Sequence, residues 1–493
     1  MARMSPFFPI IYVRGYAMTP GEIADTVATP YMGFNLGSTK VRQNPKGSVV
    51  RHIFESPLIR LMKEYGYRDN YADGAERADR MPAKSVVVYR YYDAADRDFG
   101  AGTALSIVEA GRGLKDLILR VRDHVCGDDA GLLAEFRVYL VAHSMGGLVC
   151  RAFLQNDSIS TPAERALVAK VFTYATPHNG IEIAGVNVPA MLRLWDMDNF
   201  NRKKMAGYLG LPAGVDRVDD LGGKFDPDNF FCLVGTNHRD YEVALGFSRR
   251  LAGEMSDGLV KIENATVRGA PRAFVYRSHS GIYGIVNSEE GYQNLVRFLF
   301  GDIRVDGSVE VSSLPLPPSV QKALEAGKAV EGSYYFEATV VPRGAFMFKL
   351  TERRVETYSA VLRSFEELMD PAGIGRAVPR SPILFSAYLD SSRITVGRSL
   401  VFAVDVAVSS TGYTIDGALW RDQHISGEYL YRNTITIRVT PGTSGWNVYY
   451  TFADDRWSES RGKKAGSDGT SFSIPLQSQK GFAATLVLRG RGV

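Results

Sequence analysis

A serine at the end of an apolar run constrains the fold more than any other feature of this sequence. The run 138–143, Val-Tyr-Leu-Val-Ala-His, is typical of a buried strand, and it stops at Ser144. Apolar residues in the stretch 148–154 then repeat at helical spacing. Ala142 and Gly146, two residues on either side, are small enough for a strand and a helix to pass each other at a tight turn. The pattern therefore predicts a strand, a sharp turn and a helix, with the Ser144 hydroxyl held free at the turn.

This layout resembles the nucleophile elbow of the α/β-hydrolase lipases. Residues 142–147, Ala-His-Ser-Met-Gly-Gly, are similar to the elbow of the branch that includes bacterial true lipases and glycosylphosphatidylinositol inositol-deacylase-like proteins. Residues 175–180, Ala-Thr-Pro-His-Asn-Gly, resemble the segment that follows the next strand in those enzymes. The resemblance covers about residues 7 to 301. It implies an α/β-hydrolase fold with a mainly parallel sheet, and a serine that acts as a nucleophile.

A serine hydroxyl is a weak nucleophile until a base takes its proton. In α/β-hydrolases the base is a histidine that follows the serine and the acid in the chain. His279 fits best, because a short strand at 273–276 precedes it and a helix at 288–300 follows, as at the carboxyl end of a parallel strand. We interpret His178 as a loop-shaping residue and His143, next to the serine, as a structural histidine. The other histidines after the elbow are His238 and His424.

The acid that orients the histidine should follow the preceding strand, which we expect at 230–234. Two aspartates come after it, Asp240 and Asp257. Residues 256–260, Ser-Asp-Gly-Leu-Val, resemble the stretch in which bacterial lipases keep their triad acid. We prefer Asp257 on this ground, and Asp240 remains the alternative.

Acyl transfer also needs hydrogen-bond donors for the oxyanion. One is the backbone N–H after the nucleophile, which belongs to Met145. By the resemblance, the second is the N–H of Tyr16, in the loop after a first core strand at 9–13. Arg14 departs from the family pattern, in which His-Gly precedes an apolar residue. Its side chain is expected either to pair with a loop carboxylate, to lean toward the substrate or to serve the structure.

No cofactor and no metal are expected. Bacterial true lipases often carry a calcium-ligating aspartate two residues past the triad histidine, and that position is Gly281 here. Zinc and EF-hand spacings do not occur, and no glycine-rich phosphate loop follows a strand. We interpret the acidic residues Asp93, Asp96 and Asp98 as a solvated turn. The net charge of +4 over 493 residues shows no nucleic-acid footprint, so no nucleic-acid partner is expected.

The cysteine count and the chain's hydropathy bear on its compartment. Cys126, Cys150 and Cys232 cannot form a disulfide framework, and their apolar surroundings predict buried thiols. No charged and then apolar leader precedes the first expected strand, and no stretch approaches 18 apolar residues. We therefore expect a protein that is cytoplasmic or exported by a leaderless route. The sequence does not predict the oligomeric state.

Chain length and a change of hydrophobic period predict two domains. We expect a catalytic domain at 1–304 with a lid-like insertion at about 181–229, and a proline-rich linker at 305–320. Beyond the linker, a period of two predicts an all-β, sandwich-like domain at 321–493. In the insertion, Arg-Lys-Lys at 202–204 is expected to be a solvated helix face or a contact for anionic head groups. The strands expected in the second domain are 334–341, 383–389, 400–408, 434–439, 446–452 and 483–488.

These patterns predict a serine ester hydrolase of lipase or phospholipase type, with the triad Ser144, His279 and Asp257. The substrate class, a lipid acyl ester, follows from the resemblance and from the insertion. The second domain is expected to supply a docking surface for a membrane or a protein. Two alternatives stay open: an antibacterial phospholipase effector, and a binding module whose hydrolase domain is inactive.

Overall fold

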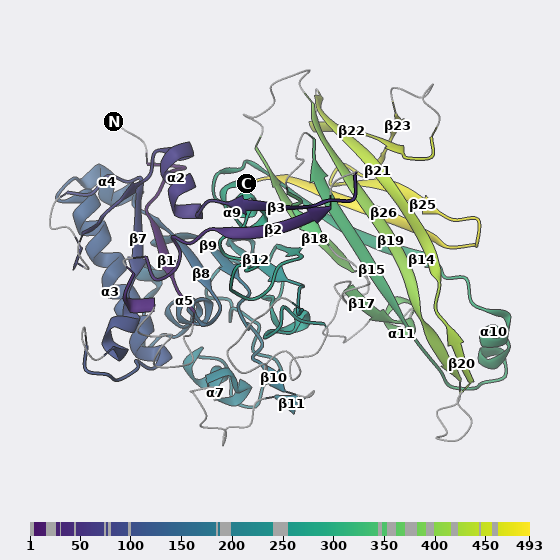
Figure 1. The fold of residues 1–493 in the computed structure, drawn as a ribbon, viewed down its shortest axis with the longest axis horizontal. Helices are drawn as coiled ribbons and strands as arrows, with labels where there is room; N and C mark the ends of the chain where they lie inside the picture. Colours follow the sequence, from purple (N-terminus) through teal and green to yellow (C-terminus); the bar gives the residue numbers. More distant parts are fainter. Residues whose placement is uncertain are drawn as a thin grey trace. The chain divides into compact units, whose positions relative to one another are not determined.

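The computed structural model divides into two compact units, Met1–Phe300 and Gly301–Val493 (Figure 1). The residues that the structure describes are 4–15, 26–29, 31–43, 46–72, 75–76, 80–96, 100–183, 186–187, 199–239, 255–343, 348–352, 361–369, 382–390, 399–415, 423–442, 445–455 and 462–493.

Seven parallel strands form the central sheet of the first unit, in the order β13-β12-β9-β8-β1-β7-β4. All residues of β1, β7 and β12 are buried, as is usual for a parallel sheet that helices cover on both faces. The predicted α/β-hydrolase fold is therefore confirmed for this unit. The strands are β1 (Ile10–Val13), β4 (Arg68–Asp69), β7 (Ser85–Tyr89), β8 (Val138–His143), β9 (Val168–Tyr174), β12 (Phe230–Gly235) and β13 (Arg272–Val275).

Helices connect most of these strands, and two small two-stranded ribbons that precede β7 in the chain lie outside the sheet. Ser106 and Glu109 form a capping box at the start of α3, which fixes the entry of the longest helix. None of the helices within the described residues is long and apolar enough to cross a membrane. The helices are α2 (Pro57–Tyr65), α3 (Ile107–Cys126), α4 (Ala130–Glu135), α5 (Met145–Gln155), α6 (Pro162–Arg165), α7 (Arg202–Tyr208) and α9 (Glu289–Phe300). The ribbons pair β2 (Ser38–Gln43) with β3 (Val49–Phe54) and β5 (Tyr71–Ala72) with β6 (Ala75–Glu76).

The insertion expected at 181–229 has a described part that packs on the first unit. It contains the short pair β10 (Glu182–Ile183) and β11 (Val186–Asn187), followed by α7. Met205 and Leu209 of this part are fully buried, whereas Lys203 and Lys204 are exposed. The amphipathic stretch 190–195, which we expected to be part of a lid, lies outside the described residues.

Two antiparallel sheets make up the second unit, and α10 (Pro318–Glu325) and α11 (Phe365–Met369) accompany them. One sheet has the order β18-β14-β26-β25-β24, and the other has the order β16-β15-β19-β21-β22-β23, with β17 paired to β15 and β20 to β19. The first comprises β14 (Ile303–Ser313), β18 (Ile383–Leu389), β24 (Gly466–Ser467), β25 (Ser471–Gln477) and β26 (Ala483–Gly492). The second comprises β15 (Val330–Pro342), β16 (Thr351–Glu352), β17 (Val361–Ser364), β19 (Leu400–Ile415), β20 (Gln423–Ser426), β21 (Tyr429–Gly442), β22 (Gly445–Phe452) and β23 (Lys463–Lys464).

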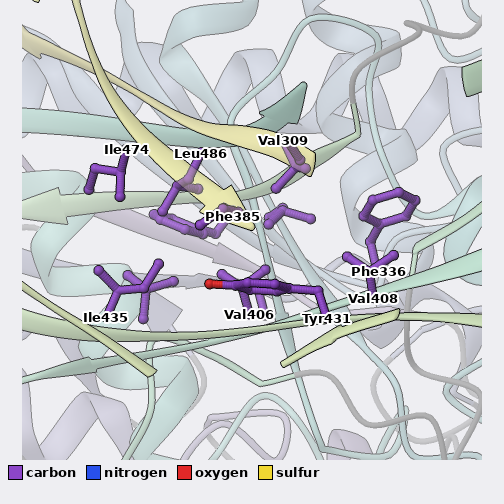
Figure 2. Close-up of a cluster of buried hydrophobic side chains, with 14 of the residues drawn as sticks. Val309, Phe336, Phe385, Val406, Val408, Tyr431, Ile435, Ile474 and Leu486 are labelled. Carbon is purple, nitrogen blue, oxygen red and sulfur yellow. The ribbon is translucent and has the colours of Figure 1, made fainter. Parts of the chain in front are cut away.

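One hydrophobic core lies between the two sheets of this unit (Figure 2). Phe385 and Leu486 come from the first sheet, while Phe336 and Val406 come from the second. Buried residues alternate along β15, so that one face of the strand lies in the core. The prediction of an all-β sandwich is confirmed by this arrangement.

The segment 305–320, which we expected to be a linker, is structured differently. Most of β14 and the first residues of α10 lie within it, and only 314–317 connect the two elements. Gly307 interrupts the alternation of apolar and polar residues along β14, so the sequence pattern does not indicate a strand there. A Cβ at Gly307 would lie 2.4 Å from the ring of Phe385, so glycine is needed where the neighbouring strand's phenylalanine crosses it.

Candidate active site

Ser144 lies at the turn between β8 and α5, as the sequence predicts. Its backbone has φ 52° and ψ −127°, a conformation that side-chain-bearing residues rarely adopt. The backbone N–H of Ser144 donates to the carbonyl of Tyr174, at 2.9 Å, and the hydroxyl of Thr176 donates to the carbonyl of Ser144, at 2.8 Å. The end of β9 therefore holds the strained turn in place.

Glycines allow three segments to meet at this turn. A Cβ on Gly146 would lie 2.3 Å from the carbonyl oxygen of Val13, and one on Gly15 would lie 2.4 Å from the Cβ of Ser144. Side chains at these two positions would collide with backbone or with Ser144 itself. The sequence thus brings the carboxyl end of β1 directly against the serine.

The structure brings Ser144, His279 and Asp257 together. The Nε2 of His279 lies 3.0 Å from the Oγ of Ser144, and its Nδ1 lies 2.9 Å from the Oδ2 of Asp257. All three residues are buried, with Ser144 only 4% exposed. A carboxylate accepts hydrogen bonds, so Nδ1 carries the proton and Nε2 is left to accept the serine proton.

A tight turn fixes the carboxylate of Asp257. Its Oδ1 accepts from the backbone N–H groups of Leu259, at 3.0 Å, and Val260, at 2.8 Å, which leaves Oδ2 to face the histidine. The backbone N–H of His279 donates to the carbonyl of Asp257, at 3.0 Å. Gly235, at the end of β12, lets this turn approach, because a Cβ there would lie 2.8 Å from the Cβ of Asp257. Backbone and side chain of the aspartate therefore both locate the imidazole.

His143 links the serine turn to the histidine loop. Its Nε2 lies 3.0 Å from the carbonyl oxygen of His279, and the two rings are 5.0 Å apart between centroids. Burial, together with the nearby His279 and Arg14, holds the pKa of His143 well below its ordinary value. The neutral ring can donate from Nε2 to that carbonyl. The sequence predicts a structural role for His143, and the structure shows that its side chain contacts the loop that carries His279.

A buried ion pair that sequence reasoning missed supports the same loop. Arg277, two residues before His279, donates from Nε and Nη2 to a carboxylate oxygen of Glu290 in α9, at 3.1 and 3.0 Å. Both side chains are 2% exposed. Loss of either partner of a buried ion pair leaves the other charge buried without compensation. The pair therefore holds the two segments that carry it together. The pair joins the end of β13 to the helix after it.

A second missed residue is Arg151, which is fully buried in α5. Its guanidinium donates to the backbone carbonyls of His178, Val218 and Asp220, at 2.8, 2.6 and 2.8 Å. Burial lowers the pKa of Arg151 to about 10, so the side chain stays charged at neutral pH. Arg151 therefore ties the helix that follows Ser144 to the described part of the insertion.

The two expected oxyanion donors have different outcomes. Met145 is the first residue of α5, and its N–H belongs to the helix-terminal amides that have no acceptor within the helix. Tyr16 lies outside the described residues. Arg14 has a structural role, because its Nη1 donates a hydrogen bond to the carbonyl of Met32. The hydroxyl of Tyr91 donates to the carbonyl of Arg14, at 2.8 Å.

The other residues that the sequence suggested lie away from Ser144, His279 and Asp257, or they are outside the described residues. His178 is buried and its Nε2 lies 3.1 Å from the hydroxyl of Thr173, which agrees with a loop-shaping role. Asp240, the alternative acid, and Asp98 are not among the described residues. Within the part of the chain that is described, no group of His, Cys, Asp and Glu side chains could hold a metal ion. The three cysteines are free and buried, as predicted.

Comparisons with known proteins give distant likenesses. No protein-family model and no curated protein matches the chain. Among solved structures, phospholipase PlaB from Legionella pneumophila is 13% identical with a TM-score of 0.35, over 81% of this chain and 86% of that one. The product of gene lin2722 from Listeria innocua is 12% identical with a TM-score of 0.26, over 59% and 93%. The Tle4-Tli4 complex is 13% identical with a TM-score of 0.21, over 58% and 66%. Likenesses this distant carry no argument about activity, which has to be inferred from the site itself.

Proposed function

We propose that this protein is a serine carboxylic-ester hydrolase that acts on lipid acyl esters. The observation that carries the proposal is the continuous chain of contacts from Asp257 through His279 to Ser144, at 2.9 and 3.0 Å. A serine on a strained turn, a histidine within reach and a carboxylate behind it are the parts that acyl transfer through a serine requires. The complete set weighs against an inactive binding module.

The first half of the reaction forms an acyl-enzyme. The Oγ of Ser144 attacks the ester carbonyl carbon while its proton passes to the Nε2 of His279. The oxyanion that develops accepts hydrogen bonds from the N–H of Met145 and, by the proposal, of Tyr16. Asp257 stabilises the imidazolium. The carbon–oxygen bond to the alcohol then breaks, and His279 gives its proton to the departing oxygen.

Hydrolysis of the acyl-enzyme repeats these steps with water. His279 takes a proton from a water molecule whose oxygen attacks the acyl carbon, and the second tetrahedral intermediate uses the same donors. Its collapse releases the carboxylic acid and returns the proton to the Oγ of Ser144. The enzyme is regenerated without any cofactor in these steps.

The burial of the triad supports an extended, apolar substrate. Because Ser144 and His279 are only 4% and 3% exposed, we propose that a cover over the site moves to admit the ester. An enzyme that hydrolyses small, soluble esters gains little from such a cover. At a lipid surface, in contrast, the apolar residues that are exposed when the cover opens can contact acyl chains. Lipid acyl esters are therefore the substrate class that we favour.

Hydrolysis of p-nitrophenyl esters of increasing chain length, followed by phospholipids, tests this proposal. Wild-type protein should cleave these esters, with kcat/KM rising as the acyl chain lengthens. Ser144→Ala should lower kcat by about five to six powers of ten and leave the fold intact, because the substitution is small and the triad acts as a unit. Ser158→Ala, the same substitution at an exposed serine beyond the far end of α5, is the matched control and should retain full activity. Substantial activity in Ser144→Ala would refute the mechanism.

A further inference from the structure

The hairpin of β2 and β3, with Leu36 just before it, exposes unusual amounts of apolar surface. Among the described residues of the first unit, Ile53 and Val49 are the most exposed large hydrophobic side chains, at 81% and 70%. Leu36 is 58% exposed. We call residues 36–43 and 46–54 the docking hairpin. Aliphatic groups left in water gain free energy when another surface covers them, so a cluster of them marks a contact site.

The docking hairpin is also strongly cationic. It carries Lys40, Arg42, Lys46 and Arg51, and the sequence has no Asp or Glu anywhere between residues 26 and 54. This one segment therefore has a formal charge equal to the +4 of the whole chain. The next acid, Glu55, is held by the ammonium group of Lys63 at 2.8 Å, which offsets its charge. The partner of this surface should be anionic as well as apolar.

Contacts place the base of the docking hairpin next to the loop that carries His279. The amide of Asn287 donates to the carbonyl of Gly33, at 3.0 Å, and the guanidinium of Arg277 lies 5.6 Å from the ring centroid of Phe54. Ile282, three residues beyond the histidine, is 60% exposed. A surface bound by the hairpin would therefore lie close to the loop that completes the triad.

We propose that the docking hairpin, together with Ile282, binds the surface of an anionic phospholipid bilayer. Val49 and Ile53, which share one face of β3, enter the boundary between head groups and acyl chains, and the formal charge of +4 on the segment attracts the anionic head groups. A nucleic acid would use the cations and leave the aliphatic side chains in water, so it fits this surface less well. Binding to the bilayer does not require ester hydrolysis, so this inference goes beyond the proposed function.

Sedimentation with vesicles tests this directly, in full-length protein that carries Ser144→Ala so that no lipid is consumed. The vesicles contain phosphatidylcholine alone or an equal mixture with phosphatidylglycerol. We expect binding to the mixed vesicles only. Val49→Ser with Ile53→Ser should weaken it about tenfold, and Lys46→Gln with Arg51→Gln about 30-fold at low salt.

Controls separate this proposal from a general loss of folding and from the proposed function. Leu133→Ser, at an exposed leucine of α4, should bind vesicles like the parent, and the hairpin substitutions in a chain with Ser144 should leave soluble-ester hydrolysis unchanged. The proposal is overturned if both hairpin pairs bind as the parent does, which would place docking elsewhere, as on the sandwich. Equal binding to phosphatidylcholine alone, or charge-dependent binding of an oligonucleotide with no vesicle binding, overturns it as well.

Discussion

The two units of this molecule bury their polar groups in different ways. In the first unit, buried polar residues gather where parallel strands end: Ser144 follows β8, Thr176 follows β9, Asn237 follows β12 and His279 follows β13. In the sandwich, the buried faces of strands such as β15 are apolar or aromatic. Parallel strands have all their carboxyl ends at one edge, so segments far apart in the sequence meet there. Antiparallel strands alternate their ends, and this sandwich uses its buried faces for a core.

We expect the largest difference between the two units when a buried carboxylate is replaced in each of them. Asp257→Asn should lower kcat by about 10⁴, because the amide no longer holds His279 in the tautomer that accepts the serine proton. Glu352→Gln in the sandwich, where the carboxylate is 2% exposed and binds Lys349 at 2.6 Å, should leave kcat within about twofold. Steady-state kinetics on a soluble ester measure both. A mild Asp257→Asn would transfer the acid role to Asp240.

The reverse test makes the sandwich unstable and leaves the chemistry alone. Phe336 is fully buried in the core of the second unit, and Phe336→Ala should lower the free energy of unfolding of that unit by about 3–5 kcal/mol. Three of the four tryptophans lie beyond residue 400, so their fluorescence during denaturant unfolding reports mainly on the sandwich. Tyr335→Ala, at the neighbouring and less buried position, should cost less. A parallel loss of soluble-ester hydrolysis under native conditions would contradict the independence of the two units.

A smaller effect should come from His143, which acts on the triad through the carbonyl of His279. His143→Ala should lower kcat about tenfold with KM unchanged, because the histidine loop loses a donor that locates it. His143→Gln supplies a new N–H donor and should recover most of the loss. If Ala and Gln behave alike, the hydrogen bond has no positioning role.

Removal of the sandwich should have only a small effect on the chemistry. A chain that ends at Phe300, the last residue of the first unit, should stay folded and hydrolyse soluble short-chain esters within about threefold of the full-length rate. Circular dichroism and ester kinetics check the two parts of this expectation. An insoluble product would show that the first unit needs the second for its stability.

Local patterns predicted the elements well and the contacts between them poorly. The strand expected at 383–389 has those bounds, because only Ser386 interrupts its apolar run. β14 was missed since Gly307 and neighbouring polar residues break its alternation. Ser144 and His279 could be named because each follows a recognisable strand, and Asp257 because residues 256–260 resemble the stretch that holds the triad acid in bacterial lipases. Arg151 could not, since two of the carbonyls that it binds lie 67 and 69 residues further along the chain.

Covalent labelling with an alkyl fluorophosphonate tests the central claim, an activated serine in the first unit, most directly. The probe phosphonylates a serine only when a base takes its proton, so it needs no knowledge of the substrate. Mass spectrometry of the digested wild-type protein should find the label on the peptide that contains Ser144, with labelling lost in Ser144→Ala and strongly slowed in His279→Ala. An unlabelled Ser144 in folded wild-type protein, or equally fast labelling in His279→Ala, would contradict the proposed triad.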